Sequence, residues 1–221
     1  MAHPPATVIL IHGLYMNSLC MRPLGRRLRR AGFRVEYFVY PTMRRSLCDS
    51  AGALLDFIHA RAAGGEVHLV GHSLGGLLLR HLPAVTDRCP ARRMVTLAAP
   101  HRGSAVVRRL SAGHGRLLFG RSLDAGLLGS LPPWPRDWQL GSLAGTQPAG
   151  VGCLLRLVHE PSDGTITVSE TVCEGMADHV CVPRSHANML LCPQVAAQIQ
   201  CFLGQGRFAL QADTLSDIMA G

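Results

Sequence analysis

EVHLVGHSLGGLLLR, residues 66–80, is the stretch of this sequence that decides its fold. A short apolar run, residues 66–70, leads into Gly71-His-Ser-Leu-Gly75, and a second apolar run, residues 76–79, follows. A short apolar run bounded by glycine is typical of a buried strand, and glycine tolerates the backbone conformations that a tight turn demands. The stretch therefore predicts a strand that turns sharply into a helix, with Ser73 at the turn.

The same alternation of short apolar runs and helical stretches recurs along the chain. Strands are predicted at residues 7–11, 33–39, 66–71, 93–98 and 153–159, with a short last strand at 179–182. Helices are predicted at residues 21–31, 46–62, 74–82 and 194–203. Such strand–helix units build a mostly parallel sheet, and right-handed crossovers place helices on both of its faces. We therefore expect an α/β fold, a three-layer α/β/α sandwich with about six strands.

Residues 102–150 depart from this alternation. They are rich in Gly, Pro, Ser and Leu, include Trp134 and Trp138, and show no strand-like run. A segment this long inside a compact domain is more often a functional insertion than a plain loop. We expect a short cap over the edge of the sheet, with ordinary crossover helices as the alternative. Residues 1–205 would then form one domain, and residues 206–221 a C-terminal tail.

The composition is that of one compact domain. Of the 221 residues, 48% are hydrophobic and 16% charged, and a chain of this length buries about 70% of its unfolded surface. No apolar run reaches the ~18 residues of a membrane helix. Met1-Ala-His-Pro-Pro5 leads directly into the run at residues 7–11, which leaves no room for a signal peptide. We expect a cytoplasmic protein, although a secreted form without its leader would show the same pattern.

The net charge of +8 comes with arginine as the sole basic residue type besides histidine. The densest cluster, residues 22–34, surrounds Leu24 and Leu28, whose spacing predicts a helix with one buried stripe. A solvated helix face is the simplest interpretation, and a surface for nucleic acid or anionic lipid is the alternative. Because aromatic residues are not interleaved with the arginines, we expect no nucleic-acid partner; peripheral membrane contact stays open.

The eight cysteines are scattered and form no C-x-x-C pair, so no structural zinc site is indicated. Cys173 and Cys181, with His179 and His186 nearby, fit no strong metal or disulfide spacing. We expect mostly buried free thiols and no metal site.

Ser73 stands in a G-x-S-x-G pattern at a strand-to-helix turn, which predicts a nucleophile elbow. At such a turn the helix N-terminus offers N–H groups to a developing oxyanion. The first strand ends in His12-Gly13-Leu14, where glycine lets the backbone approach a substrate. We expect the N–H groups of Leu74 and Leu14 to form the oxyanion hole, and His12 to order the loop by hydrogen bonds.

A serine nucleophile of this kind is followed along the chain first by an acid and then by a histidine. Asp163 lies in EPSDG, residues 160–164, after the predicted strand at 153–159. The carboxyl end of a strand is where sites gather in open parallel sheets. We therefore expect Asp163 to be the acid, with Glu160 as its substitute and a purely turn-forming role as the alternative.

His186 is the expected base because it lies in a loop just before the last predicted helix. Its rival, His179, lies in an apolar stretch that a strand would bury. A neutral imidazole must accept the serine proton, so activity should fall as the pH drops through the range of histidine titration, near ~6.5.

Five segments carry a resemblance to a known family: VILIHGL (8–14), LVGHSLGG (69–76), VTLAAPHRGS (95–104), SDGT (162–165) and SH (185–186). Together they resemble bacterial lipases and esterases of the α/β-hydrolase superfamily. The APHRGS segment is similar to true lipases and to hydrolases that act on glycolipid-anchor lipids. The resemblance implies an acyl-enzyme mechanism without a cofactor, in which Ser73 attacks the ester and His186 activates water. The usual first antiparallel strands are missing, which implies a minimal α/β-hydrolase with a short cap.

The resulting hypothesis is a serine carboxylic ester hydrolase that acts on apolar small-molecule or lipid esters. A thioesterase or acyltransferase with the same triad stays open, because the sequence does not distinguish these reactions. An interaction protein that has kept the fold is the alternative from another class, although such relatives usually lose a triad member. The oligomeric state is not predicted.

Overall fold

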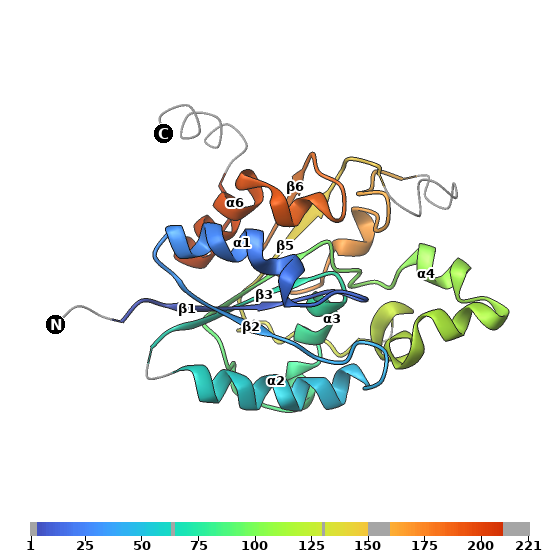
Figure 1. The fold of residues 1–221 in the computed structure, drawn as a ribbon, viewed down its shortest axis with the longest axis horizontal. Helices are drawn as coiled ribbons and strands as arrows, with labels where there is room; N and C mark the ends of the chain where they lie inside the picture. The colour runs from blue at the N-terminus through green and yellow to red at the C-terminus, as the bar shows by residue number, and fades with distance from the viewer. Residues whose placement is uncertain (1–3, 63–64, 130, 150–159, 210–221) are drawn as a thin grey trace.

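The computed structural model describes residues 4–62, 65–129, 131–149 and 160–209. One sheet of parallel strands runs through the molecule in the order β2-β1-β3-β4-β5-β6 (Figure 1). Its strands are β1 (Thr7–Ile11), β2 (Arg34–Phe38), β3 (Val67–His72), β4 (Arg93–Leu97), β5 (Leu140–Gly145) and β6 (Asp178–Val182). The predicted three-layer α/β fold with about six strands is confirmed.

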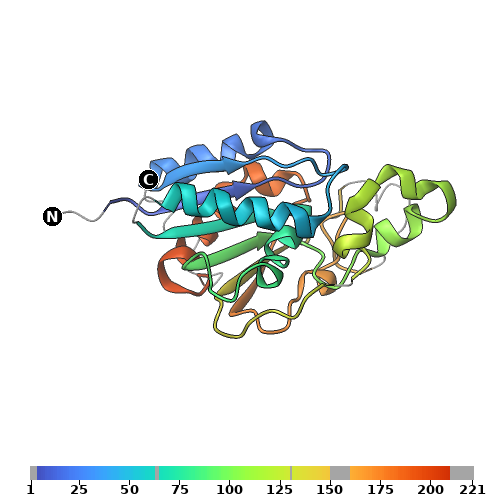
Figure 2. The same cartoon turned by 90° about the horizontal axis from the view of Figure 1, so that it is seen from below.

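Helices cover both faces of the sheet. The helices α2 (Leu47–Ala62) and α3 (Leu74–Leu79) lie on one face, and α1 (Ser18–Arg30) and α6 (Pro193–Gln205) lie on the other (Figures 1 and 2). Successive side chains of a strand point to opposite faces. In β1, Ile9 and Ile11 therefore join the core under α2 and α3, while Val8 and Leu10 join the core under α1 and α6. Two apolar layers result, which explains why residues 8–11 of β1 are all apolar.

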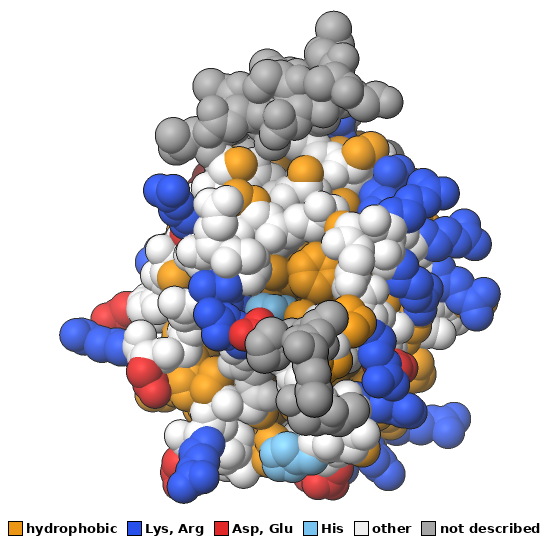
Figure 3. All heavy atoms as spheres, turned by 90° about the vertical axis from the view of Figure 1, so that its left-hand side faces the viewer, with side chains coloured by type: hydrophobic (Ala, Val, Ile, Leu, Met, Phe, Trp, Pro, Cys, Tyr) orange, Lys and Arg blue, Asp and Glu red, His pale blue; other side chains and the backbone are white. Residues whose placement is uncertain are grey.

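The helix α1 matches the predicted pattern of one buried stripe. Leu24 and Leu28 are fully buried, whereas Arg26 and Arg30 are exposed. Figure 3 shows the end of the molecule that faces away from α4, and arginine side chains gather along one side of it. A solvated basic face is thus what the structure presents here.

The strand order reverses between β1 and β3, since the chain passes from β1 outward to β2 and then returns to the other side of β1. Ile11 pairs with Gly71, so the loop that begins at His12 and the turn at Ser73 leave the sheet side by side. In open α/β sheets a crevice forms at such a reversal, outside the carboxyl ends of the strands. The fold thus positions two of the predicted site segments together.

The strand β5 corrects the sequence analysis, which expected no strand between residues 102 and 150. Its sequence, LGSLAG, is too rich in small residues to read as a strand. These small residues have a physical reason: a Cβ at Gly141 would lie 2.7 Å from the Phe202 and Phe208 rings. The strand predicted at residues 153–159 lies outside the described residues.

The segment after β4 forms α4 (Ala105–Leu110), the 3₁₀ helices η2 (Gly113–Leu118) and η3 (Gly120–Ser122), and the π-helical turn η4 (Leu123–Leu127). In both views these elements project beyond the carboxyl ends of the strands (Figures 1 and 2). Trp134 and Trp138 are not part of this projection but are buried in the core under α3. The function of the projection as a cap, and the limits of the domain and tail, stay predictions.

No helix within the described ranges has the length and apolar character needed to cross a membrane.

Candidate active site

Ser73 occupies a strained backbone conformation between β3 and α3. Its φ is +52° and its ψ is −118°, a region that L-amino acids rarely adopt. The turn is held because the Ser73 N–H donates to the Leu97 carbonyl over 2.8 Å, and the Gly76 N–H donates to the Ser73 carbonyl over 2.9 Å. The predicted sharp strand-to-helix turn is therefore confirmed.

The glycines around Ser73 are required by close backbone approach. A Cβ at Gly71 would lie 2.5 Å from the carbonyl oxygen of Gly75. A Cβ at Gly75 would lie 2.5 Å from the Ile11 carbonyl oxygen, and one at Gly76 would lie 2.5 Å from the Ala99 Cβ. Side chains at these positions would push the turn away from β1 and from the end of β4.

Asp163 and His186, which are distant in sequence, are in direct contact. The Nδ1 atom of His186 lies 2.6 Å from Oδ2 of the buried Asp163. The other carboxylate oxygen, Oδ1, accepts from the N–H groups of Thr165 (2.8 Å) and Ile166 (2.7 Å), and the His186 N–H donates to the Asp163 carbonyl over 3.1 Å. These bonds fix the carboxylate, and because a carboxylate oxygen only accepts, Nδ1 of His186 is the donor in the contact with Asp163.

The Asp163–His186 pair lies at the carboxyl end of β5. A Cβ at Gly145, the last residue of that strand, would lie 2.7 Å from the Asp163 Cβ and on the Arg184 carbonyl oxygen. Glycine here lets the loops that carry both residues close over the strand end. The pair thus shares the sheet edge at which β3 turns at Ser73.

The two rivals in the sequence analysis have other hydrogen-bond partners. The Glu160 carboxylate accepts from the Ser169 hydroxyl over 2.8 Å. Nε2 of His179, in β6, lies 2.9 Å from the Thr171 hydroxyl.

His72, which directly precedes Ser73, contacts the loop that carries His186. The sequence pattern alone did not indicate this contact. Nε2 of His72 donates to the main-chain carbonyl of His186 over 3.1 Å, and the two rings lie 4.7 Å apart. Burial, with a smaller contribution from His186, lowers the pKa of His72 to about 3. The ring is therefore a neutral donor at ordinary pH. The only signal available was its position directly before Ser73.

The loop after β1 is ordered by His12, as predicted. Nδ1 of His12 lies 3.0 Å from the Gly13 carbonyl oxygen, and the Tyr40 hydroxyl donates to the His12 carbonyl over 3.1 Å. The two rings stack at 4.9 Å, and burial lowers the pKa of His12. A Cβ at Gly13 would lie 3.1 Å from the Ser73 Cβ. The loop thus touches the serine turn.

The predicted oxyanion-hole residues flank this contact. Leu74 is the first residue of α3, and the first N–H groups of a helix have no partner within the helix. Leu14 follows Gly13 in the ordered loop and packs against the core. Their N–H groups are suited to a shared oxyanion, and that function stays a proposal.

The Glu170 side chain links the loop that carries Asp163 to the start of α4. The sequence analysis did not identify this residue. One oxygen of this buried carboxylate accepts from the Ala105 N–H at the start of α4, and the other accepts from the Thr167 N–H over 2.9 Å. The Asp163 turn and α4 are thereby held by one side chain.

Among the described residues, no group of three or more His, Cys, Asp or Glu side chains could hold a metal ion, and no disulfide joins the described cysteines. The expectation of mostly buried thiols is wrong, because among the described cysteines only Cys173 and Cys192 are buried, while Cys20, Cys48 and Cys89 are exposed. Cys20 and Cys48 lie on the outward sides of α1 and α2, next to the buried Met21 and Leu47.

Residues 8–200 match the alpha/beta hydrolase family, so the chain belongs to that family. Among solved structures, it is similar to the mature lipase BlEst2 of Bacillus licheniformis, with 18% identity, a TM-score of 0.71, and coverage of 93% of this chain and 92% of the lipase. It is also similar to the thioesterase RedJ of the prodiginine pathway in Streptomyces coelicolor, with 15% identity, a TM-score of 0.57, and coverage of 93% and 89%. A thermophilic esterase from Thermogutta terrifontis matches with 15% identity, a TM-score of 0.57, and coverage of 93% and 92%. At these identities the likeness shows the fold alone. No curated protein matches the sequence.

Proposed function

We propose that this protein is a serine hydrolase that cleaves carboxylic esters, with Ser73 as nucleophile, His186 as base and Asp163 as acid. The observation that carries the proposal is the 2.6 Å contact between Asp163 Oδ2 and His186 Nδ1. With Nδ1 bound to Asp163, Nε2 of His186 is available to accept a proton. The main-chain carbonyl of His186 accepts a hydrogen bond from His72, the residue before Ser73.

The proposed reaction proceeds through an acyl-enzyme. His186 Nε2 accepts the Ser73 proton as Oγ attacks the ester carbonyl, and the alcohol leaves with that proton. Water activated by His186 then attacks the acyl carbonyl, releases the carboxylic acid and restores Ser73. The N–H groups of Leu14 and Leu74 stabilise the oxyanion in both steps, and the loss of one such donor costs about 3 kcal/mol of transition-state stabilisation.

Apolar acyl esters are the proposed substrates. Tyr15 follows Leu14 in the loop after β1 and is 65% exposed, and Leu191 follows the His186 loop and is 52% exposed. Exposed apolar side chains on the segments that carry the site favour an apolar substrate over a charged one. The lipase and esterase neighbours are consistent with a small-molecule ester, and RedJ keeps an acyl thioester as the second candidate.

A fluorophosphonate probe tests the nucleophile directly. We expect a covalent adduct on Ser73 in the wild-type protein and none in Ser73→Ala, with Ser18→Ala as the matched control that still reacts. Folded wild-type protein without an adduct on Ser73 would overturn the proposal.

A series of nitrophenyl esters of increasing chain length, measured beside acyl-CoA thioesters and alcohol acceptors, identifies the reaction. We expect ester hydrolysis that increases with acyl length and is absent in Ser73→Ala. Faster turnover of thioesters would assign the protein to the thioesterases instead.

A further inference from the structure

A cavity of about 630 Å³ lies at the end of α3 that is remote from Ser73. Arg80, the residue directly after α3, lines it together with Trp134 and Arg136 from the segment before β5 and Glu174 from the segment before β6. None of the proposed catalytic residues lines this cavity. It is therefore distinct from the candidate active site.

Among the residues that the structure describes, Arg80 is a buried cation without a carboxylate partner. The residue is 6% exposed, and its Nε has no hydrogen-bond partner. The terminal nitrogens donate to the Cys173 sulfur over 2.9 Å and to the Pro132 carbonyl. Within the described ranges, no carboxylate lies within the 4 Å ion-pair distance of its guanidinium. Burial lowers the pKa of Arg80, as expected for a charge removed from water without an ionic partner.

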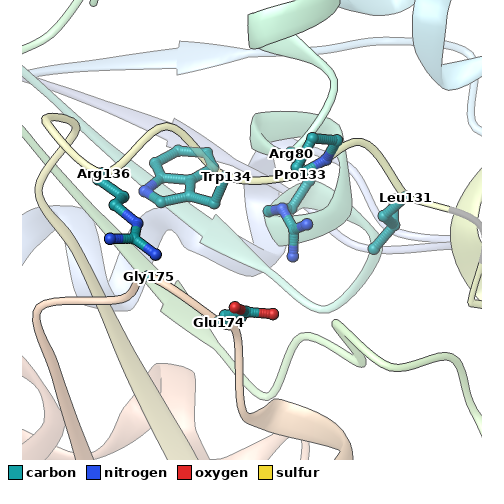
Figure 4. A pocket seen from close by; sticks show the side chains of 7 residues that line it. All are labelled: Arg80, Leu131, Pro133, Trp134, Arg136, Glu174 and Gly175. Carbon is teal, nitrogen blue, oxygen red and sulfur yellow. The ribbon is translucent and has the colours of Figure 1, made fainter.

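A second guanidinium faces the same space. Figure 4 shows the guanidinium groups of Arg80 and Arg136 on the two sides of the Trp134 indole, with the Glu174 carboxylate across from them. Arg136 and Glu174 are both exposed, and no ion pair joins Glu174 to either arginine. Two cations against one anion leave the lining positive.

We propose that this cavity binds a small organic oxyanion, a carboxylate or a phosphate ester on an apolar body. Guanidinium groups present paired N–H donors that match the oxygens of both groups. Leu131, Pro133 and Trp134 supply an apolar wall for the rest of the ligand. Glu174 lowers the positive charge of the lining, so a singly charged carboxylate is the better match.

The protein carries its own reporter for this site. It has two tryptophans; Trp134 lines the cavity, and Trp138 packs edge-on against it with ring centroids 5.6 Å apart. Both tryptophans thus lie at or next to the cavity, so intrinsic tryptophan fluorescence of the full chain should respond when a ligand binds there. Cyclohexanecarboxylate, cyclohexyl phosphate, inorganic phosphate and the neutral cyclohexanecarboxamide are titrated at constant ionic strength.

We expect a saturable fluorescence change with cyclohexanecarboxylate and no change with the amide. A stronger response to cyclohexyl phosphate would assign the ligand to phosphate esters, within the same proposal. No saturable change with any anion, or an equal change with the amide, would overturn it.

Variants locate the binding. Arg136→Gln should weaken carboxylate binding by at least about tenfold, the loss expected when one charge-assisted hydrogen bond is removed. Arg136 is exposed, so this variant is informative even if Arg80→Gln fails to fold. Arg30→Gln, on the opposite face of the sheet, removes the same charge and should bind as the wild type does. Unchanged affinity in Arg136→Gln would place the ligand elsewhere. Ser73→Ala should retain binding, which separates this inference from the proposed activity.

Discussion

The imidazole of His72 donates a hydrogen bond to the main-chain carbonyl of His186 over 3.1 Å. The residue before the proposed nucleophile thus holds the backbone of the proposed base. Burial lowers the pKa of this ring to about 3, so the ring is neutral near pH 7 and donates through Nε2.

Removing this bond should affect turnover more than substrate binding. We expect His72→Phe to lower kcat by about 10- to 100-fold with little change in KM, because a small displacement of a base slows proton transfer. His72→Gln retains a donor and should recover part of the loss. Equal activity of both variants, measured by ester hydrolysis, would show that the bond has only a structural role.

Replacement of the two candidate histidines should separate their functions. His186→Ala should reduce kcat by about 10⁴-fold or more, the scale measured when a triad member is removed. His179→Ala should remain active, because Nε2 of His179 contacts the Thr171 hydroxyl and not Asp163. An inactive His179→Ala beside an active His186→Ala would transfer the function of base to His179.

Stability should fall in mild acid. Burial lowers the pKa of His68 to about 4, and the pKa values of His72 and His101 to about 3. The unfolded chain binds these protons near pH 6.5, whereas the folded protein does not, so the free energy of unfolding decreases as the pH falls below 6.5. Each group contributes up to about 1.4 kcal/mol per pH unit.

Urea unfolding at a series of pH values between 7 and 4 measures this decrease. In His101→Gln, the free energy of unfolding should depend less steeply on pH, by about one bound proton, because one of the imidazoles with a lowered pKa is removed. A free energy of unfolding that does not change over this range would contradict the prediction.

Gly145→Ala should impair the site more than the fold. Its methyl group would lie 2.7 Å from the Asp163 Cβ and against the Arg184 backbone, so both loops that carry the Asp163–His186 pair must shift. We expect at least about a tenfold loss of kcat, since small misplacements of reacting groups are costly. Gly52→Ala, in α2, is the matched control. A Cβ added at this position would have no atom within 4 Å, and alanine there should stabilise the helix by about 0.5–1 kcal/mol. Full activity of Gly145→Ala would contradict the close contact at this strand end.

Much of the fold could be predicted because hydrophobic patterning reports burial directly. The apolar run at residues 8–11 predicts the strand Thr7–Ile11 with the bounds that the structure has, and all five of its residues are buried. The approach of Asp163 and His186 could also be anticipated from their order along the chain after Ser73. The function of these three side chains remains a proposal.

The rest depends on contacts that single-residue patterns do not encode. The sequence does not indicate β5 because its glycines are set by contacts with residues that are distant along the chain. Gly141 leaves space for the Phe202 ring, and Gly145 leaves space for Asp163. His72 and Glu170 act through backbone atoms of other segments, and hydropathy carries no record of such bonds. That the buried Arg80 has no carboxylate partner among the described residues became visible only when its surroundings were known.

The slender β5 has a consequence for how this chain tolerates change. Gly141 leaves space for the Phe202 ring of α6, and Gly145 leaves space for the loop that carries Asp163. The lack of side chains at these two positions of β5 allows both α6 and the Asp163 loop to pack closely against the strand. Any lasting enlargement of position 141 or 145 should therefore require a compensating reduction at position 202 or a rearrangement around 163, so that substitutions at these sites arise together and not singly.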